Sequence, residues 1–171
     1  QGNYASMPPK YWPNVGVTRS TSQILTDLTG NSSITANNLT YGSDGSFTFN
    51  GSNSYLDAGN AAAVQLGSTL TLEAWVNPTN SSGSGNIIQK NQNSGYRFRI
   101  SNGDLWAYSS GNSVTTSGSP CANGTWCHCV ATFGPSGLVV YVNGVALASN
   151  STAYSPANVA AGNLQIGRAH V

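Results

Sequence analysis

The side chains best suited to metal or redox chemistry lie together in one short segment. Cys121, Cys127, His128 and Cys129 follow the pattern C-x5-C-H-C, which resembles a zinc box. Structural zinc sites favour cysteines about two to four residues apart on a turn, whereas alternation along a strand directs Cys127 and Cys129 away from His128. We therefore expect either a disulfide of Cys121 with Cys127 or Cys129, or three small buried hydrophobic side chains.

The residues needed for hydrolytic catalysis are scarce. A serine or cysteine nucleophile would need His128 or His170 as its base, and His128 lies in the middle of the strand-like segment 125–133. Glycoside hydrolysis needs two carboxylates. Glu73 is the single glutamate, and the aspartates lie in or beside turns: Asp27, Asp44, Asp57 and Asp104. We expect a protein that is not an enzyme.

Aromatic, amide and arginine side chains recur between residues 91 and 108 in a pattern typical of sugar sites. The candidate ligand-binding residues are Asn91, Asn93, Arg97, Arg99, Trp106 and Tyr108. Trp106 is the best candidate for an exposed platform. Trp75 and Trp126 are expected in the core, and Glu73 is expected to pair with Arg97 across strands, although Trp75 could also meet the two arginines.

The elements that must position these residues are short β-strands. Strand-like segments recur about every dozen residues between Gly, Asn and Ser, and no long segment has helical periodicity. Side chains alternate with a period of two in segments 69–76 and 96–100. Asn143-Gly144 lies between two apolar segments and favours a two-residue hairpin turn with positive φ at both positions. The pattern predicts an all-β sandwich.

Composition limits the classes of partner. The chain has 171 residues and 39% hydrophobic content, enough for one sandwich core. Only 6% of residues are charged and the net charge is +1, so we expect no nucleic-acid binding. No apolar segment approaches the roughly 20 residues of a membrane-spanning helix. A surface rich in Asn, Ser, Thr and Gly is typical of exported or virion-surface proteins.

The first twenty residues differ from the rest of the chain. Pro8, Pro9 and Pro13 disfavour regular secondary structure there. We therefore expect an extended N-terminal arm over residues 1–20, followed by one β-sandwich domain over residues 21–171.

Several short motifs follow one another in a specific order. They are Asp27-Leu28-Thr29-Gly30-Asn31, Phe49-Asn50-Gly51 with Tyr55 and Asp57, Glu73-Ala74-Trp75-Val76, Trp126-Cys127-His128-Cys129-Val130, and Tyr141-Val142-Asn143-Gly144. Their order and spacing over about residues 24–168 resemble the laminin-G-like branch of the concanavalin A-like lectin and glucanase superfamily, in its bacterial and phage form. The resemblance implies an antiparallel jelly-roll β-sandwich of two sheets.

One family feature has no counterpart here. Laminin-G-like domains usually continue with a further strand after a phrase like Leu164-Gln165-Ile166-Gly167-Arg168, and this sequence ends at Val171. An unfilled sheet edge exposes N–H and C=O groups and invites another chain to pair. The resemblance therefore predicts that the chain is a fragment, or that a neighbouring subunit or the N-terminal arm supplies the strand.

The resemblance also raises the possibility of calcium. Some laminin-G-like and pentraxin-like sandwiches hold Ca²⁺ with loop carboxylates and carbonyls, which would imply a weak site at Asp27, Asp44 and Asp57. The alternative is that these aspartates stabilise turns. We expect no other cofactor.

These observations predict a non-catalytic interaction module. The first hypothesis is a virion structural or surface component, such as a capsid decoration, tail or fibre protein. It would engage neighbouring subunits as a homo-oligomer and could also bind glycans. The second is a lectin-like, carbohydrate-binding module of a secreted or cell-surface protein, and the third is a glycoside hydrolase. The expected location is the virion surface or the extracellular space.

Overall fold

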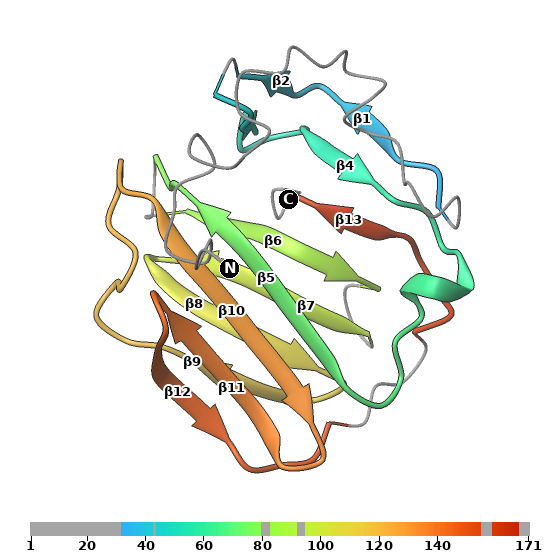
Figure 1. Cartoon of the computed structure of the whole chain (residues 1–171), viewed down its shortest axis with the longest axis vertical. Helices are drawn as coiled ribbons and strands as arrows, with labels where there is room; N and C mark the ends of the chain where they lie inside the picture. Colours follow the sequence, from blue (N-terminus) through green and yellow to red (C-terminus); the bar gives the residue numbers. More distant parts are fainter. Residues whose placement is uncertain (1–31, 43, 80–82, 92–94, 155–158, 168–171) are drawn as a thin grey trace, which may run out of the picture.

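Two antiparallel sheets pack face to face, which confirms the predicted all-β sandwich (Figure 1). The computed structural model describes residues 32–42, 44–79, 83–91, 95–154 and 159–167. The predicted arm over residues 1–20 lies outside these ranges. Within the described ranges, no helix has the length and apolar character needed to cross a membrane.

The larger sheet has seven strands in the order β1-β4-β13-β6-β7-β8-β9. Its strands are β1 (Thr35–Asn37), β4 (Tyr55–Asp57), β13 (Leu164–Ile166), β6 (Ser84–Lys90), β7 (Tyr96–Ser101), β8 (Asp104–Ser109) and β9 (Asn112–Thr115). The smaller sheet has four strands in the order β12-β11-β10-β5. They are β12 (Val145–Asn150), β11 (Gly137–Val142), β10 (Cys127–Gly134) and β5 (Leu70–Val76). A separate hairpin contains β2 (Thr40–Tyr41) and β3 (Phe47–Thr48).

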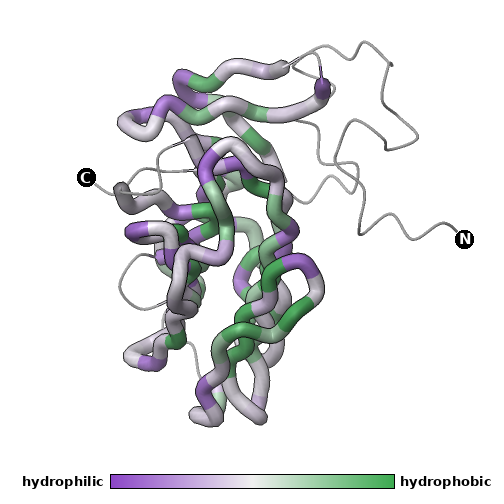
Figure 2. Tube along the Cα trace, turned by 90° about the vertical axis from the view of Figure 1, so that its left-hand side faces the viewer, coloured by the Kyte–Doolittle hydropathy of each residue, from purple (hydrophilic) through white to green (hydrophobic). Residues whose placement is uncertain are grey.

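The core lies between the two sheets, which Figure 2 shows edge on. Alternation along each strand supplies it, because every second side chain points inward. The larger sheet contributes Tyr96, Phe98, Leu105, Ala107 and Val114, and the smaller contributes Leu70, Leu72, Cys129, Ala131, Phe133, Leu138 and Val140. The side chains between the inward residues of β7 and β8 therefore point to the outer face of the larger sheet.

The turn between β11 and β12 has the predicted geometry. Asn143 has a φ of 49° and Gly144 a φ of 83°, so both central residues lie in the left-handed region. The Asn143 side chain also accepts a hydrogen bond from the backbone N–H of His128 at 2.9 Å. This turn therefore ties β10 to the hairpin that follows it.

Two buried tyrosines hold the segment around the 3-10 turn η3 (Ala62–Val64) against the sandwich. The Tyr96 hydroxyl donates to the carbonyl of Val64 at 2.9 Å, and the Tyr154 hydroxyl donates to the carbonyl of Leu66 at 3.0 Å. Burial raises the pKa of Tyr96 to about 12 and also raises the pKa of Tyr154. Both phenols are thus held in the neutral form that donates these bonds.

The strand Leu164–Ile166 is an interior strand of the larger sheet. It pairs with β4 on one side and with β6 on the other, both within this chain. In the smaller sheet, by contrast, the described residues give β5 a single neighbour, β10. A further strand could therefore pair with the other side of β5. The missing strand itself stays a prediction.

Candidate functional site

Two arginines and two aromatic residues lie side by side on the outer face of the larger sheet. Arg97 and Arg99 on β7 stand opposite Tyr108 and Trp106 on β8 in the strand register. All four side chains share this face because their neighbours along each strand point into the core. We call Arg97, Arg99, Trp106 and Tyr108 the arginine–aromatic cluster.

The rings and guanidinium groups of the cluster contact one another. The Trp106 and Tyr108 rings stack with centroids 5.2 Å apart. The Arg97 guanidinium lies 4.6 Å from the Trp106 ring centroid and 5.5 Å from that of Tyr108, and the Arg99 guanidinium lies 5.0 Å from Trp106. Such cation–π contacts fix the charged groups in place without neutralising them.

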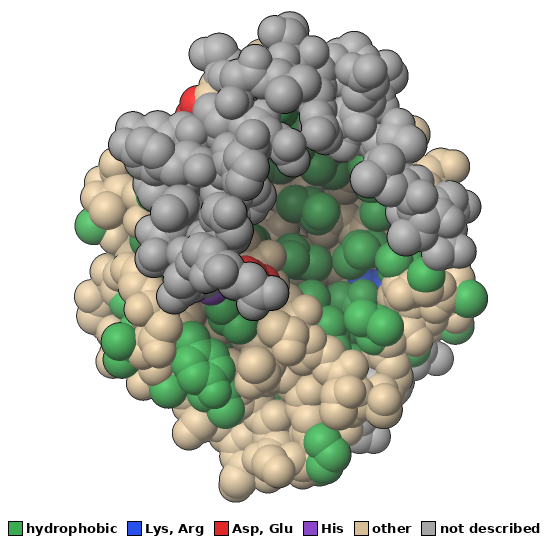
Figure 3. Space-filling model, viewed as in Figure 1, with side chains coloured by type: hydrophobic (Ala, Val, Ile, Leu, Met, Phe, Trp, Pro, Cys, Tyr) green, Lys and Arg blue, Asp and Glu red, His purple; other side chains and the backbone are tan. Residues whose placement is uncertain are grey.

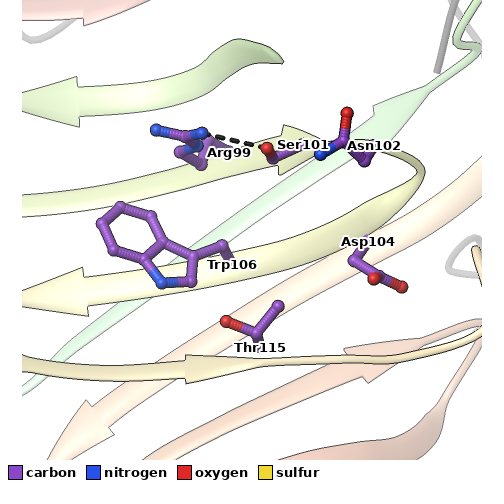
Figure 4. A pocket seen from close by; sticks show the side chains of 6 residues that line it. All are labelled: Arg99, Ser101, Asn102, Asp104, Trp106 and Thr115. Atoms are coloured by element: carbon purple, nitrogen blue, oxygen red, sulfur yellow. Dashed lines mark hydrogen bonds between the residues drawn. The ribbon is translucent and has the colours of Figure 1, made fainter. Parts of the chain in front are cut away.

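A shallow hollow of about 320 Å³ adjoins the cluster (Figure 4). It is lined by Arg99, Ser101, Asn102, Asp104, Trp106 and Thr115. These side chains come from β7, β8, β9 and the hairpin turn between β7 and β8. An aromatic ring beside hydroxyl, amide, carboxylate and guanidinium groups offers both an apolar surface and hydrogen-bonding partners for a polar ligand.

Hydrogen bonds fix Arg99 at the edge of the hollow. Its Nη2 donates to the hydroxyls of Ser84 and Ser101, at 3.0 Å each, and these two hydroxyls lie 2.7 Å from each other. Asp104, which is the carboxylate that lines the hollow, accepts a hydrogen bond from the backbone of Ser119 at 3.1 Å. The hollow therefore offers one carboxylate, not the pair that glycoside hydrolysis requires.

A row of amides extends this polar face toward β4. Gln89 on β6 donates to Gln165 on β13 at 3.0 Å, and Gln165 donates to Asp57 on β4 at 3.2 Å. Asn163 also donates to both Asp57 carboxylate oxygens. Sequence reasoning missed this row because its members lie on strands that are far apart in the sequence, and the segment Ile87-Ile88-Gln89-Lys90 shows no alternation that would mark it.

Of the two predicted asparagines, Asn91 is described by the structure and does not line the hollow. Asn91 follows β6, and its carbonyl accepts a hydrogen bond from Gly95 across the turn that leads into β7. That turn is at the end of β7 opposite to Asn102. Asn93 lies outside the described residues. The structure thus places Arg97, Arg99, Trp106 and Tyr108 together and leaves Asn91 apart from them.

Two of the three aspartates proposed for calcium, Asp44 and Asp57, lie among the described residues and accept hydrogen bonds. Asp44 Oδ1 accepts from the backbone and the hydroxyl of Ser46 in the β2–β3 turn. Asp57 accepts from the backbone of Gly59 as well as from the amide row. Asp27 lies outside the described residues. Asp44 and Asp57 thus lie on different elements, and each accepts a backbone hydrogen bond from a residue two positions further on. The weak calcium site stays a prediction.

A disulfide joins Cys121 to Cys127, with Cα atoms 5.9 Å apart. Cys129 is a buried free thiol, and burial raises its pKa to about 12. The three sulfur atoms lie within 4.8 Å of one another. Because the disulfide uses two of them and the third stays protonated, they do not form a set of metal-binding thiolates in this state.

Glu73 and Trp75 lie on the outer face of the smaller sheet, which corrects two expectations. Glu73 pairs with His128 at 2.9 Å and not with Arg97, because β5 and β7 belong to different sheets. The half-buried Trp75 ring lies 5.2 Å from the His128 ring instead of lying in the core. His128 is thus a hydrogen-bonded strand residue.

Comparisons with known proteins agree with this architecture. A family model of the laminin G type, described as concanavalin A-like lectin/glucanases superfamily, matches residues 50–171. The chain belongs to this superfamily. Among curated proteins, no sequence matches it.

Several solved structures share the fold. The receptor binding domain of botulinum neurotoxin C/D mosaic serotype matches with a TM-score of 0.67 and 14% identity over 84% of this chain. The botulinum neurotoxin serotype D ligand binding domain in complex with N-acetylneuraminic acid matches with a TM-score of 0.66 and 16% identity over 84% of this chain. This chain spans 40% of the length of each toxin domain.

A third solved structure shares the fold over a smaller part of this chain. It is a candidate carbohydrate binding protein from Bacteroides ovatus, with a TM-score of 0.52 and 19% identity. The match covers 60% of this chain and 32% of that protein. At these identities the likenesses establish the fold alone.

Proposed function

We propose that this chain is a non-catalytic, lectin-like module that binds glycans on the outer face of its larger sheet. The observation that carries the proposal is the arginine–aromatic cluster beside the polar hollow. The stacked Trp106 and Tyr108 rings contact the two arginines. The hydroxyl and amide groups of Ser101, Asn102 and Thr115 line the adjoining hollow, within reach of the same ligand. Aromatic surface with nearby hydrogen-bonding groups suits a sugar ring, which has an apolar face and polar edges.

The fold family supports this proposal by analogy. Two of the similar structures are a toxin domain with bound N-acetylneuraminic acid and a candidate carbohydrate binding protein. Because the chain covers less than half of each, the glycan contacts of those proteins need not lie in the shared part. The support for a site at this position is therefore the local geometry of β7, β8 and β9.

A glycan array with the wild-type protein and two single variants tests the proposal. Trp106→Ala removes the larger ring of the cluster and is expected to reduce glycan binding about tenfold or more, since a buried aromatic contact carries much of such affinity. Trp75→Ala is the matched control, because Trp75 lies on the outer face of the other sheet. It is expected to leave glycan binding unchanged.

Other outcomes of this experiment would contradict the proposed position of the glycan site or the proposed function. If Trp75→Ala abolished binding and Trp106→Ala did not, the glycan site would lie on the smaller sheet. If the correctly folded wild-type protein bound no glycan, the proposed function would be wrong.

A second candidate function is assembly into a virion or another surface particle. The observation that favours it is the side of β5 that has no partner in the described residues. Hydrophobic side chains gather in a hollow on that side of β5 (Figure 3). A strand from a second copy could pair there, because free N–H and C=O groups attract a strand. Light scattering tests this candidate, since assembly raises the mass above the 17.6 kDa of one chain.

Both candidates place the protein outside the cytosol. The Cys121–Cys127 disulfide supports that location, because disulfides persist in oxidising compartments and on virion or cell surfaces. We therefore extend the proposal to an extracellular or virion-surface protein. Non-reducing peptide mapping of the native protein from its source tests this extension, and a fully reduced Cys121 there would contradict it.

A further inference from the structure

Arg97 carries a positive charge that the described residues do not compensate. The residue is 8% exposed, and its side-chain Nε has no hydrogen-bond partner among the described residues. Among the described residues, the contact between a basic group and a carboxylate is that of His128 with Glu73, on the other sheet. Burial and the neighbouring Arg99 charge both lower the pKa of Arg97. A buried charge without a counter-charge is costly, and ring faces are a weaker substitute for an anion.

Arg99 adds a second positive charge beside the first. It lies two residues along the same strand face, and its Nε also lacks a hydrogen-bond partner. The described residues contain three basic side chains, Lys90, Arg97 and Arg99, so most of their positive charge is concentrated here. Asp104 supplies one negative charge at the hollow but forms no ion pair with either arginine. The site therefore keeps a net positive charge.

Other unsatisfied polar atoms lie on the same face. Among the described residues, five buried side-chain atoms lack a hydrogen-bond partner, and two of them belong to Arg97 and Arg99. Two more are Asn86 Oδ1 and Gln89 Oε1, whose residues stand opposite Arg99 and Arg97 in the strand register. Natural proteins satisfy nearly all buried polar atoms, so the outer face of β6 and β7 holds most of the unsatisfied hydrogen-bonding capacity of the described residues.

We propose that the arginine–aromatic cluster recognises the carboxylate of an acidic sugar. This inference rests on the glycan-binding function proposed above and names the class of glycan. A carboxylate accepts strong charge-assisted hydrogen bonds from a guanidinium. Arg99 lines the hollow, and its Nη1 forms no hydrogen bond among the described residues, so this atom is the donor available to the carboxylate. The sugar ring would lie in the hollow against Trp106, where the side chains of Ser101, Asn102 and Thr115 can bind its hydroxyls.

The geometry favours a sugar acid over a small inorganic anion. The hollow of about 320 Å³ is at the lower end of the size range of ligand sites and much larger than a single small ion needs. Its lining contains neutral hydroxyl and amide groups as well as charge, which suits a ligand with several hydroxyls and one carboxylate. Both N-acetylneuraminic acid and uronic acids carry this combination.

An array of acidic glycans and their neutral counterparts tests the inference. One arm carries terminal N-acetylneuraminic acid and a second carries glucuronic acid, which distinguishes the two sources of a sugar carboxylate. For the acidic glycan that binds best, the methyl ester has nearly the same shape without the charge. We expect esterification to weaken binding about tenfold or more, and added salt to weaken binding of the acid but not of the ester.

Two variants with opposite charge changes give the sharper control. Arg99→Gln is expected to lower affinity for the acidic glycan about tenfold, while affinity for its methyl ester changes less than about twofold. Asp104→Asn removes a negative charge from the same hollow and keeps an oxygen for the Ser119 backbone bond, so it is expected to raise acid affinity about two- to threefold. Unfolding midpoints of both variants show whether they remain folded.

The outcomes separate the inference from the proposed function. Equal binding of neutral and acidic glycans, with no effect of either charge change, would overturn the acidic-sugar inference and leave a glycan-binding module. A preference for the acid that Arg99→Gln leaves intact would place the carboxylate elsewhere and also overturn it. If neither acidic nor neutral glycans bound, the proposed function would fail together with the inference.

Discussion

At the scale of single residues, burial controls the protonation of the core tyrosines and the free cysteine. The pKa of Tyr96 and that of Cys129 are both raised to about 12, and the pKa of Tyr154 is raised as well. The unfolded chain releases these protons near the ordinary pKa values, whereas the folded chain retains them to higher pH. Folding is therefore favoured most below those ordinary values, and this contribution is lost as pH rises toward 12.

We expect the free energy of unfolding to fall steadily between about pH 10 and pH 12. Lys90, whose pKa burial lowers, acts in the opposite sense, but only up to its ordinary value of 10.5. Urea unfolding at a series of pH values measures the slope. Tyr96→Phe should reduce the slope, because the variant has no phenol to titrate, and should cost about 1 kcal/mol at neutral pH through the lost bond to Val64. An unchanged slope in this variant would contradict the assignment.

The disulfide is the second residue-scale feature with a measurable consequence. Its loop is short, with a sequence separation of 6, so its removal should cost about 2 kcal/mol. The double variant Cys121→Ala/Cys127→Ala is expected to lose that amount and to become insensitive to reducing agents. Urea unfolding with and without dithiothreitol measures both effects.

Cys129→Ala is the matched control for the disulfide. Removing the buried thiol makes a small cavity but leaves the bridge, so this variant should still lose stability when reduced. Alkylation of the unreduced, denatured protein should label Cys129 alone. Labelling of Cys127 would instead show that Cys121 pairs with Cys129.

At the scale of elements, the sequence predicts what each strand does locally but not which strands become neighbours. Alternation correctly placed Arg97 and Arg99 on one face, and the Asn143-Gly144 pair correctly predicted the hairpin turn. The assignment of β5 and β7 to different sheets depends on pairing between distant segments, which no local pattern encodes. For that reason Glu73 was wrongly paired with Arg97. Trp75 was also wrongly placed in the core, although alternation along β5 puts it on the same face as Glu73.

The candidate site also combines positions that a local pattern predicts with positions that depend on the order of strands in the sheet. Trp106, Tyr108 and the arginines lie on two consecutive strands, so their closeness follows from one hairpin. Thr115 comes from β9, and Gln165 from a strand more than fifty residues beyond β8. Their positions depend on the whole sheet order, so sequence reasoning could find the centre of the site but not its surroundings.

The turn between β11 and β12 gives an element-scale prediction. Gly144 has a φ of 83°, and no atom lies within 4 Å of the position that a Cβ would take. Gly144→Ala therefore acts through backbone strain alone and should lower the free energy of unfolding by about 1 kcal/mol. Gly67 also has open space but no positive φ, so Gly67→Ala is the control and should change stability by less than about 0.5 kcal/mol. Equal effects in urea unfolding would show that the turn conformation is not the cause.

At the scale of the whole molecule, the smaller sheet is the one expected to associate with a second copy of the chain, through its edge strand β5. The edge strand β5 carries a row of backbone groups without a partner in the described residues, and it borders a hydrophobic hollow (Figure 3). Nature commonly protects such edges with charged side chains, but the outer face of β5 presents Thr71, Glu73 and Trp75, with a single charge. Low net charge weakens the repulsion that would otherwise keep copies apart.

We therefore expect association that depends on concentration, with masses above 17.6 kDa in light scattering. Thr71→Lys places a charge on the exposed face of β5 and should weaken dimerisation about tenfold, whereas Ser149→Lys on the exposed face of β12, at the other edge of the same sheet, should not. A wild-type mass of 17.6 kDa at every concentration would remove self-assembly through β5 as a function. Glycan recognition on the larger sheet would still stand, because the arginine–aromatic cluster and the β5 edge lie on different sheets and can fail independently.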